Sequence, residues 1–278
     1  MRRRELIMGE RVWTAVLRPA STSAYGRLVA IAHSASGPTS LMRLLRRLPA
    51  GIDVVGVTLP GRERRIAEGT AQLRVDPGGA VDAVLHELRG YPPLPTVLFG
   101  HSMGAAFATA MVLADRDVCA GLVVSGHPGC LSAGDLAPPT WTEGELLDLL
   151  RVGGGTPAEL LADPVIRAYL LDLLRCDLTV ARRLAIQNDG KRIPVPLTVL
   201  GGRQDSLVTM AQLRAWATRA PYGVRQRLFP GGHFYLLDEA NVEPVAAEIS
   251  AAFPPPEPVA ATAATLPARV PNGADPDG

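Results

Sequence analysis

Cysteine is scarce in this sequence, whose three thiols are Cys119, Cys130 and Cys176. They have neither the CxxC spacing of a metal or redox site nor the even count of a disulfide framework. Such a small, odd number is typical of a protein that stays in a reducing compartment. The sequence therefore predicts a cytoplasmic protein with no metal site.

Net charge and long apolar runs are also lacking. The 28 basic and 27 acidic residues leave a net charge of +1, too small to attract nucleic acid or an anionic membrane without a local cluster. The clearest basic cluster is Arg2 to Arg4, and the chain reaches Glu5 and Glu10 before any apolar run of signal-peptide length. No run of about 18 apolar residues occurs. We therefore expect no nucleic acid and no membrane among the partners, and no secretion.

What the sequence does contain is the composition of one large globular domain, since 47% of its 278 residues are hydrophobic. Short apolar runs alternate with segments of helical period, which is typical of a mostly parallel central sheet with helices on both faces. The predicted class is α/β. The predicted strands are 27–33, 52–58, 95–100, 119–125, 196–201 and 224–229, and the predicted helices are 38–48, 77–89, 103–113, 209–217 and 242–252.

One interval, residues 139–191, has no strand signal and is predicted to be a helical lid insertion. Its helix-start signals are a Thr142 and Glu145 capping box, a second box from Thr156 and Glu159 with Pro157 at the first helical position, and Asp163 followed by Pro164. Leucines give these helices apolar faces. Gly153 to Gly155 offer a hinge, so the insertion is expected to be a flexible cover over an acyl-chain pocket.

The two ends of the chain are predicted to lie outside the domain. Residues 254–278 hold seven prolines in 25 positions and no helical period, which is typical of a disordered tail. Residues 1–12 are predicted to be an N-terminal extension, with Met8 as an alternative start. The domain itself is expected to span residues 13–253.

The strongest chemical signal is the segment Gly100-His101-Ser102-Met103-Gly104, between an apolar strand and a helix-like run. A serine hydroxyl becomes a useful nucleophile when it is exposed on a sharp turn beside a base, and flanking glycines let strand and helix approach closely. Ser102 is therefore the nucleophile candidate.

A histidine base is expected after the serine in this chain order. His127 and His233 both follow it. His233 lies in a glycine-rich loop just past the last predicted strand, where its imidazole can reach over the sheet edge. We therefore assign His233 as the general base and expect a structural role for His127.

The acid of the triad should follow the penultimate strand, where Asp205 is found. A carboxylate there fixes the histidine tautomer and stabilises the imidazolium. The alternative is that Asp205 only caps the helix beginning near Val208. Asp172 and Asp189 are weaker candidates because they lie in the insertion.

The tetrahedral oxyanion of acyl transfer needs two backbone donors. One is predicted to be the amide of Met103, the residue after the nucleophile, and the other an amide of the loop after the first predicted strand, at Ser34 or Ala35.

These motifs resemble the type II thioesterases that accompany polyketide and nonribosomal peptide synthases, which have the α/β-hydrolase fold. The resemblance covers about residues 13–253. It rests on five segments in the right order, Leu59-Pro60-Gly61-Arg62-Glu63 with Arg64, Gly100 to Gly104, Gly154-Gly155-Thr156-Pro157, Gly201 to Asp205, and Gly232-His233-Phe234.

The resemblance implies hydrolysis of acyl thioesters on the 4'-phosphopantetheine arms of acyl or peptidyl carrier domains, which clears wrongly primed or stalled chains. It implies that Ser34 is the second oxyanion donor. No cofactor is implied for the enzyme itself, and we expect it to act as a monomer.

The chain departs from the family at one loop. Where the family carries P-H-A-G-G, this sequence has Ala32-His33-Ser34-Ala35-Ser36, and the loss of both glycines restricts the conformations that can aim the donor. His33 is expected to anchor this loop by a hydrogen bond. Arg62 and Glu63 are expected to form an ion pair that holds a loop near the active-site mouth, rather than to contact substrate.

Three alternatives stay open. A generic carboxylesterase or lipase would carry the same triad but prefer oxygen esters. A non-catalytic relative would serve as a binding protein, for which the altered Ser34-Ala35-Ser36 loop is the one argument. The same machinery would also serve acyl transfer to an acceptor other than water.

Overall fold

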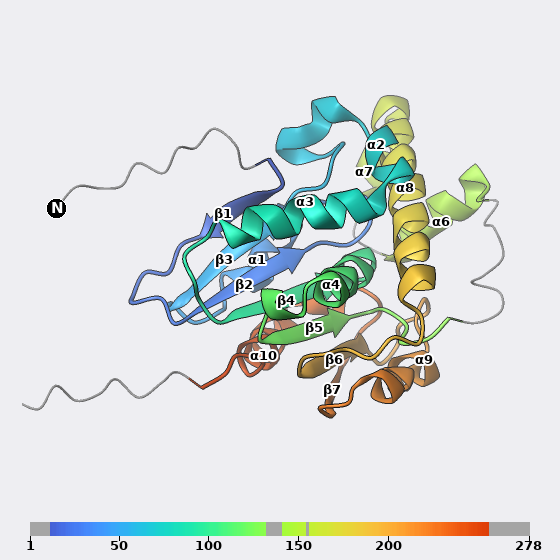
Figure 1. Ribbon diagram of the computed structural model, residues 1–278. Helices are drawn as coiled ribbons and strands as arrows, with labels where there is room; N and C mark the ends of the chain where they lie inside the picture. Colours follow the sequence, from blue (N-terminus) through green and yellow to red (C-terminus); the bar gives the residue numbers. More distant parts are fainter. Residues whose placement is uncertain (1–11, 132–140, 154–155, 256–278) are drawn as a thin grey trace, which may run out of the picture.

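A seven-stranded sheet runs through the molecule in the order β1-β3-β2-β4-β5-β6-β7 (Figure 1). In this computed structural model, residues 12–131, 141–153 and 156–255 are described. Every neighbouring pair is parallel except β1 with β3. The strands are β1 (Thr14–Arg18), β2 (Gly26–Ile31), β3 (Ile52–Val57), β4 (Thr96–His101), β5 (Gly121–Ser125), β6 (Leu197–Gly202) and β7 (Val224–Phe229).

The inner strands are apolar runs because helices cover both faces of the sheet. Every residue of β2, β4, β5 and β6 is buried, as parallel sheets require. The six predicted strands and the predicted α/β class are confirmed. The edge strand β1 was not predicted, because it is short and its residues are mostly half-buried or exposed.

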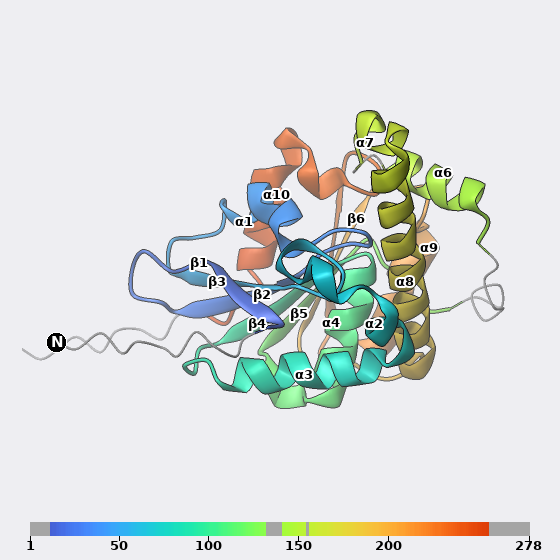
Figure 2. The same ribbon diagram turned by 90° about the horizontal axis from the view of Figure 1, so that it is seen from above.

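The helices form two layers (Figure 2). One apolar core joins the sheet to α3, α4 and α8, and a second core joins the opposite face to α1 and α10. The helices are η1 (Pro38–Leu41), α1 (Met42–Leu45), η2 (Glu63–Glu68), α2 (Ala71–Val75), α3 (Pro77–Arg89), α4 (Met103–Ala114), η3 (Arg116–Val118), α6 (Glu143–Gly153), α7 (Ala158–Ala162), α8 (Pro164–Asn188), α9 (Met210–Arg214), η4 (Ala215–Arg219), η5 (Tyr235–Leu237) and α10 (Glu239–Ser250).

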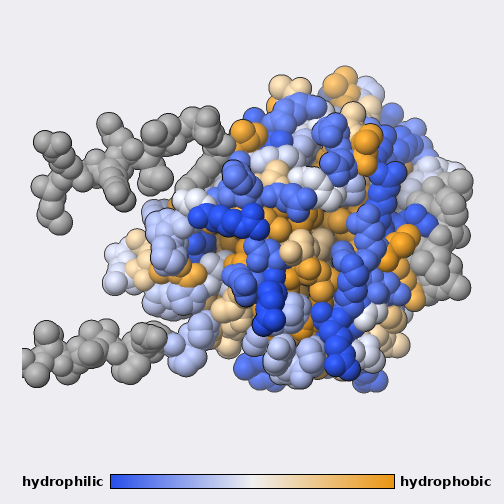
Figure 3. Space-filling view, viewed as in Figure 1, coloured by the Kyte–Doolittle hydropathy of each residue, from blue (hydrophilic) through white to orange (hydrophobic). Residues whose placement is uncertain are grey.

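Helices α6, α7 and α8 make up the described part of the predicted insertion. They enclose a separate leucine cluster, made of Leu146, Leu150, Leu161, Leu171 and Leu174. In the space-filling view, hydrophilic residues follow the outer side of α8 (Figure 3). The helical nature of the insertion is therefore confirmed, with an apolar inner side.

Helices begin at or next to all three predicted starts, and two of the three predicted side-chain caps are confirmed. Thr142 and Glu145 form the reciprocal bonds of a capping box, and Asp163 accepts from two amides at the start of α8. The box predicted from Thr156 and Glu159 is wrong: α7 has Pro157 as its N-cap residue, without a side-chain capping bond. A proline there already sets the backbone for the turn.

Parts of the predicted boundaries lie outside the described residues. These are residues 1–11, 132–140, the 154–155 portion of the predicted hinge, and 256–278. No helix among the described residues is long and apolar enough to cross a membrane.

Candidate active site

Ser102 lies on the turn between β4 and α4, as predicted. Its backbone is left-handed, with φ 55° and ψ −119°, a conformation that costs a serine about 1–3 kcal/mol. A Cβ at Gly100 would overlap the Gly104 backbone, and one at Gly104 would overlap the carbonyl of Ile31. The two glycines therefore allow the close approach that forms this sharp turn.

Asp205 and His233 meet although 28 positions separate them. His233 Nδ1 lies 2.8 Å from Asp205 Oδ2, and both side chains are nearly inaccessible to solvent. The other carboxylate oxygen, Oδ1, accepts from the amides of Leu207 and Val208. Asp205 therefore pairs with the histidine and also holds the turn at residues 205–208, but it does not cap a helix as the alternative expected, because α9 begins at Met210 with Thr209 as its N-cap.

Ser102 and His233 line the same cavity, which has a volume of about 240 Å³. We call it the active-site cavity. Ser102, Asp205 and His233 follow β4, β6 and β7, so they gather at the carboxyl edge of the parallel sheet, where ligands bind in such folds. With Nδ1 engaged by Asp205, Nε2 is the ring nitrogen left for proton transfer. This arrangement suits nucleophilic catalysis with a histidine base.

The wall of the active-site cavity is largely apolar, which suits an acyl chain. Lid helices α6 and α8 supply part of that wall, and the loop after β2 and segments after β6 and β7 supply more of it. The apolar residues are Ala35, Leu149, Leu150, Leu174, Leu178, Leu207, Phe234 and Leu237.

Of the two predicted oxyanion donors, Ser34 is among the residues that line this cavity, whereas Met103 directly follows Ser102, which lines it too. The amide of Met103 begins α4, so it has no acceptor inside the helix. Ser34 lines the cavity beside Ser102. The amide of Ala35, the alternative donor, is committed elsewhere, because it donates to Asp177 Oδ2 over 2.7 Å. Of the two candidate amides in this loop, this leaves that of Ser34.

A second histidine, His101, lies directly behind His233, with ring centroids 4.9 Å apart. His101 is fully buried, and its Nδ1 pairs with the Ser125 hydroxyl, which in turn pairs with Tyr235. Burial and then the nearby His233 hold the pKa of His101 well below its usual range. His101 is therefore a neutral packing group.

His33 belongs to the same histidine cluster. Burial, with smaller contributions from His233 and Arg62, lowers the pKa of His33 to about 3. Its Nδ1 is buried without a hydrogen-bond partner, and its ring packs on Phe234 at a centroid distance of 4.5 Å. The expectation that His33 anchors this loop by a hydrogen bond is therefore wrong, since its ring makes no hydrogen bond to the described residues. Instead, the Ser36 hydroxyl donates to the His33 carbonyl.

His127, the alternative base, does not line the active-site cavity. Its carbonyl accepts from the indole of Trp216 over 2.9 Å, which is a structural contact. Within the described part of the chain, no group of three or more His, Cys, Asp or Glu is placed to hold a metal ion.

The expected ion pair between Arg62 and Glu63 is wrong. Arg62 instead pairs with Asp177 of α8 through two bonds of 2.7 Å, and Glu63 accepts from the amide and hydroxyl of Thr39. Burial alone would lower the pKa of Arg62, but the charge and hydrogen bonds of Asp177 raise it above its ordinary value. The backbone of Glu63 is left-handed, with φ 47°, so its side chain leaves the backbone in a direction different from that of an extended residue.

Asp177 escaped the sequence analysis, although a signal was present. It shares a helical stripe with Leu173, Val180 and Leu184, all nearly inaccessible to solvent. A carboxylate in such a stripe must be buried, and a buried carboxylate needs a partner.

Comparisons with known proteins agree with this geometry. A family model for the thioesterase domain matches residues 27–253. The Probable cadicidin biosynthesis thioesterase of Streptomyces griseus is 31% identical over 83% of this chain and 64% of its own length. Thioesterase PikA5 of Streptomyces venezuelae is 28% identical over 85% of this chain and 84% of its own.

A solved structure shares the fold. The type II thioesterase BorB from the borrelidin biosynthetic cluster superposes with a TM-score of 0.66 at 27% identity, covering 85% of this chain and 97% of that one. The range matched by the family model contains Ser102, Asp205 and His233.

Proposed function

The chain belongs to the thioesterase domain family, and from this premise we propose that it is an editing type II thioesterase of polyketide or nonribosomal peptide biosynthesis. Its substrates are acyl thioesters on the phosphopantetheine arms of acyl or peptidyl carrier domains. The observation that carries the proposal is that His233, paired with Asp205, lines the same apolar cavity as Ser102.

Acylation begins when the Ser102 oxygen attacks the thioester carbonyl and His233 Nε2 takes the hydroxyl proton. Asp205 holds the ring in the required tautomer and stabilises the imidazolium. The amides of Met103 and Ser34 donate to the oxyanion. The carbon–sulfur bond then breaks, and His233 returns the proton to the leaving pantetheine thiolate.

Deacylation repeats these steps with water. His233 removes a proton from water, the hydroxide attacks the acyl carbonyl, and the ester bond to Ser102 breaks with return of the proton to its oxygen. The free acid leaves and the serine is restored. The leucine wall contributed by α6 and α8 supports a preference for an acyl chain over a polar group.

The deciding experiment is a panel of acyl-loaded carrier domains and matched oxygen esters, assayed with wild-type protein and Ser102→Ala. We expect faster turnover of the thioesters, and a loss of about 10⁴-fold to 10⁶-fold in kcat for Ser102→Ala. Ser250→Ala is the matched control, because this hydroxyl only bonds the Ala246 carbonyl within α10.

The outcomes separate the alternatives. Faster turnover of oxygen esters would replace the proposal with an esterase. Failure of a fluorophosphonate probe to label Ser102 in folded protein would replace it with a binding protein. Transfer of the acyl group to an added acceptor in preference to water would identify an acyltransferase.

A further inference from the structure

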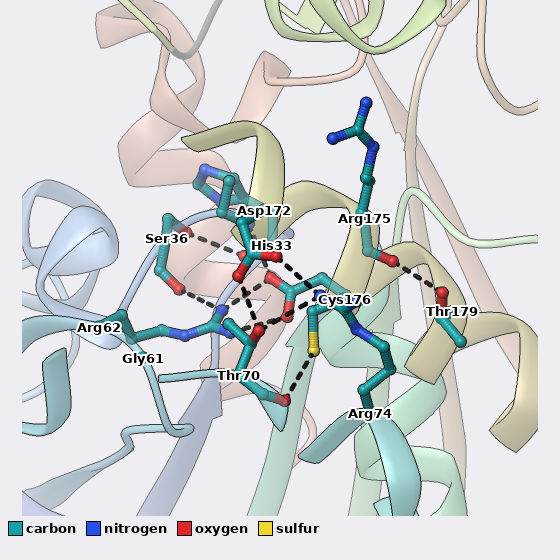
Figure 4. A network of polar contacts seen from close by, with 12 residues as sticks. His33, Ser36, Gly61, Arg62, Thr70, Arg74, Asp172, Arg175, Cys176 and Thr179 are labelled. Atoms are coloured by element: carbon teal, nitrogen blue, oxygen red, sulfur yellow. Dashed lines mark hydrogen bonds and ion pairs between the residues drawn. The ribbon is translucent and has the colours of Figure 1, made fainter. Parts of the chain in front are cut away.

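Asp177 is a fully buried carboxylate near the middle of α8. Three hydrogen bonds of 2.7 Å reach it, two from the Arg62 guanidinium and one from the Ala35 amide. Arg62 also donates to the Ser36 carbonyl over 3.1 Å (Figure 4). The pair therefore grips the loop after β2 at two successive residues.

The conformation of this loop has to be stabilised by contacts with other parts of the protein. Ala35 has φ 58°, a left-handed conformation that disfavours residues with a Cβ. Ala35 also packs against the leucine cluster of the lid helices. A short strained loop keeps such a conformation only where its surroundings impose it. The carboxylate on one side and the leucine cluster on the other are those surroundings.

The direction of the Ala35 amide determines which donor the cavity receives. Because this N–H points to Asp177, the peptide plane between Ser34 and Ala35 is held, and the preceding amide of Ser34 is left for the cavity. We propose that Asp177, together with Arg62, is a positioning residue that aims the Ser34 amide at the oxyanion. This inference rests on the proposed thioester hydrolysis.

The same helix also contacts the acyl chain in this proposal. Leu174 and Leu178 flank Asp177 on α8 and line the active-site cavity. One rigid helix thus carries part of the acyl wall and the anchor of the oxyanion loop. A change in how α8 is seated would therefore alter both together.

A neighbouring carboxylate provides a matched control. Asp172, on the same helix, accepts from the Thr70 hydroxyl over 2.7 Å and from Arg74 over 2.8 Å (Figure 4). These bonds tie α8 to the segment after β3 but do not touch the loop at Ser34. Loss of Asp172 removes a partly exposed ion pair on the surface of α8 and leaves the Ala35 amide bond in place.

The test compares a double variant, which combines Arg62→Met and Asp177→Leu, with the single variant Asp172→Ala. Replacing both charges avoids an orphaned buried ion and removes the acceptor for the Ala35 amide. We expect a fall in kcat of about 10-fold to 100-fold with KM changed less than about threefold, because the oxyanion forms only in the transition state. The Asp172→Ala variant should keep kcat within about twofold, in line with the modest effect of an exposed ion pair.

Three results would overturn the positioning role. They are an unchanged kcat in the folded double variant, an equal fall in kcat for Asp172→Ala, and a loss confined to KM. Folding is checked by thermal unfolding. If the double variant does not fold, amide hydrogen exchange in wild-type protein decides, since an Ala35 amide bonded to a buried carboxylate exchanges slowly, and free exchange would refute the bond.

A second readout separates this inference from the proposed function. If the wild-type protein hydrolyses no thioester, the proposed function fails. The fluorophosphonate labelling rate of Ser102 then still reports the oxyanion donors, because the phosphoryl oxygen uses the same amides. Equal labelling rates in wild type and the folded double variant would reject the positioning role alone.

Discussion

At the scale of single residues, Asp205 divides its two oxygens between structure and proposed chemistry. Asp205→Asn should lower kcat by about 10³-fold to 10⁴-fold, as measured with an acyl-pantetheine thioester. The carboxamide oxygen can still accept from the Leu207 and Val208 amides, whereas its NH2 group would face His233 Nδ1 and favour the wrong tautomer.

The control is Asp189→Asn, which changes the exposed carboxylate at the end of α8. It should leave kcat within about twofold, as exposed charges contribute little. A loss below tenfold in Asp205→Asn would contradict the assigned role of Asp205.

His101 makes stability depend on pH. Its pKa is lowered in the folded state, so the unfolded chain binds the proton more readily. Its contribution is therefore complete above an unfolded pKa of about 6.5 and is lost as pH falls below that value. Between pH 7.5 and 5.5, the free energy of unfolding should fall by about 1.4 kcal/mol more in wild type than in His101→Asn.

Denaturant unfolding of each protein at both pH values measures this difference. The exposed His86 serves as the comparison, and His86→Asn should show the wild-type pH dependence. The same pH dependence in His101→Asn and wild type would show that His101 is protonated as easily in the folded protein as in the unfolded chain.

At the scale of elements, the lid insertion has a fixed part and a less anchored part. Helix α8 is tied to the segment after β3 by Tyr169 donating to the Gly61 carbonyl, by Asp172, and by the buried Asp177 and Arg62 pair. It also contributes to the main core. Helices α6 and α7 meet α8 mainly through the leucine cluster. From the sequence, residues 139–191 were predicted to form one flexible lid, whereas these contacts fix α8 to the rest of the domain.

We therefore expect α6 and α7 to exchange backbone hydrogens faster than the middle of α8, because local opening costs least where few buried contacts hold a segment. Hydrogen exchange with mass spectrometry measures this by peptide. A long-chain acyl phosphonate attached to Ser102 should slow exchange in α6, whose Leu149 and Leu150 line the cavity. Peptides of α3 are the unaffected reference, and equal protection of α6 and α8 would argue against a movable cover.

The local patterns predicted some elements to the residue. Helix α3 and strand β7 begin and end where expected. The bounds of α3 are marked by Asp76 as its N-cap, Pro77 in its first turn and Gly90 after its end. Helix α2 was missed because its N-cap, Thr70, makes no side-chain capping bond and the helix has only five residues.

At the scale of the whole molecule, the C-terminal end of the domain closes one of the two cores. Phe253 follows α10 and packs with the second core. Its ring would lie 2.7 Å from a Cβ added at Gly26, so it packs directly against this glycine. Phe253→Ala should lower the free energy of unfolding by about 3 kcal/mol, through lost burial and a residual cavity. Denaturant unfolding measures the change.

Tyr222→Ala is the matched aromatic control, because Tyr222 is 64% exposed. It should change the free energy of unfolding by less than about 0.5 kcal/mol. Equal losses in the two variants would show that Phe253 is not part of the packed core.

Deletion of residues 256–278 should leave both stability and turnover unchanged if the predicted domain boundary near residue 253 is right.

The sequence by itself determined the strand order along the chain, the nucleophile turn at Ser102 and the candidates Asp205 and His233. These features are readable because turn chemistry and apolar periodicity act within a few residues. Only the tertiary structure decided that Arg62 pairs with Asp177, 115 positions away, and that the Ala35 amide donates to the same carboxylate. The partner of a buried charge depends on which distant elements the fold packs together, and no local pattern encodes that choice.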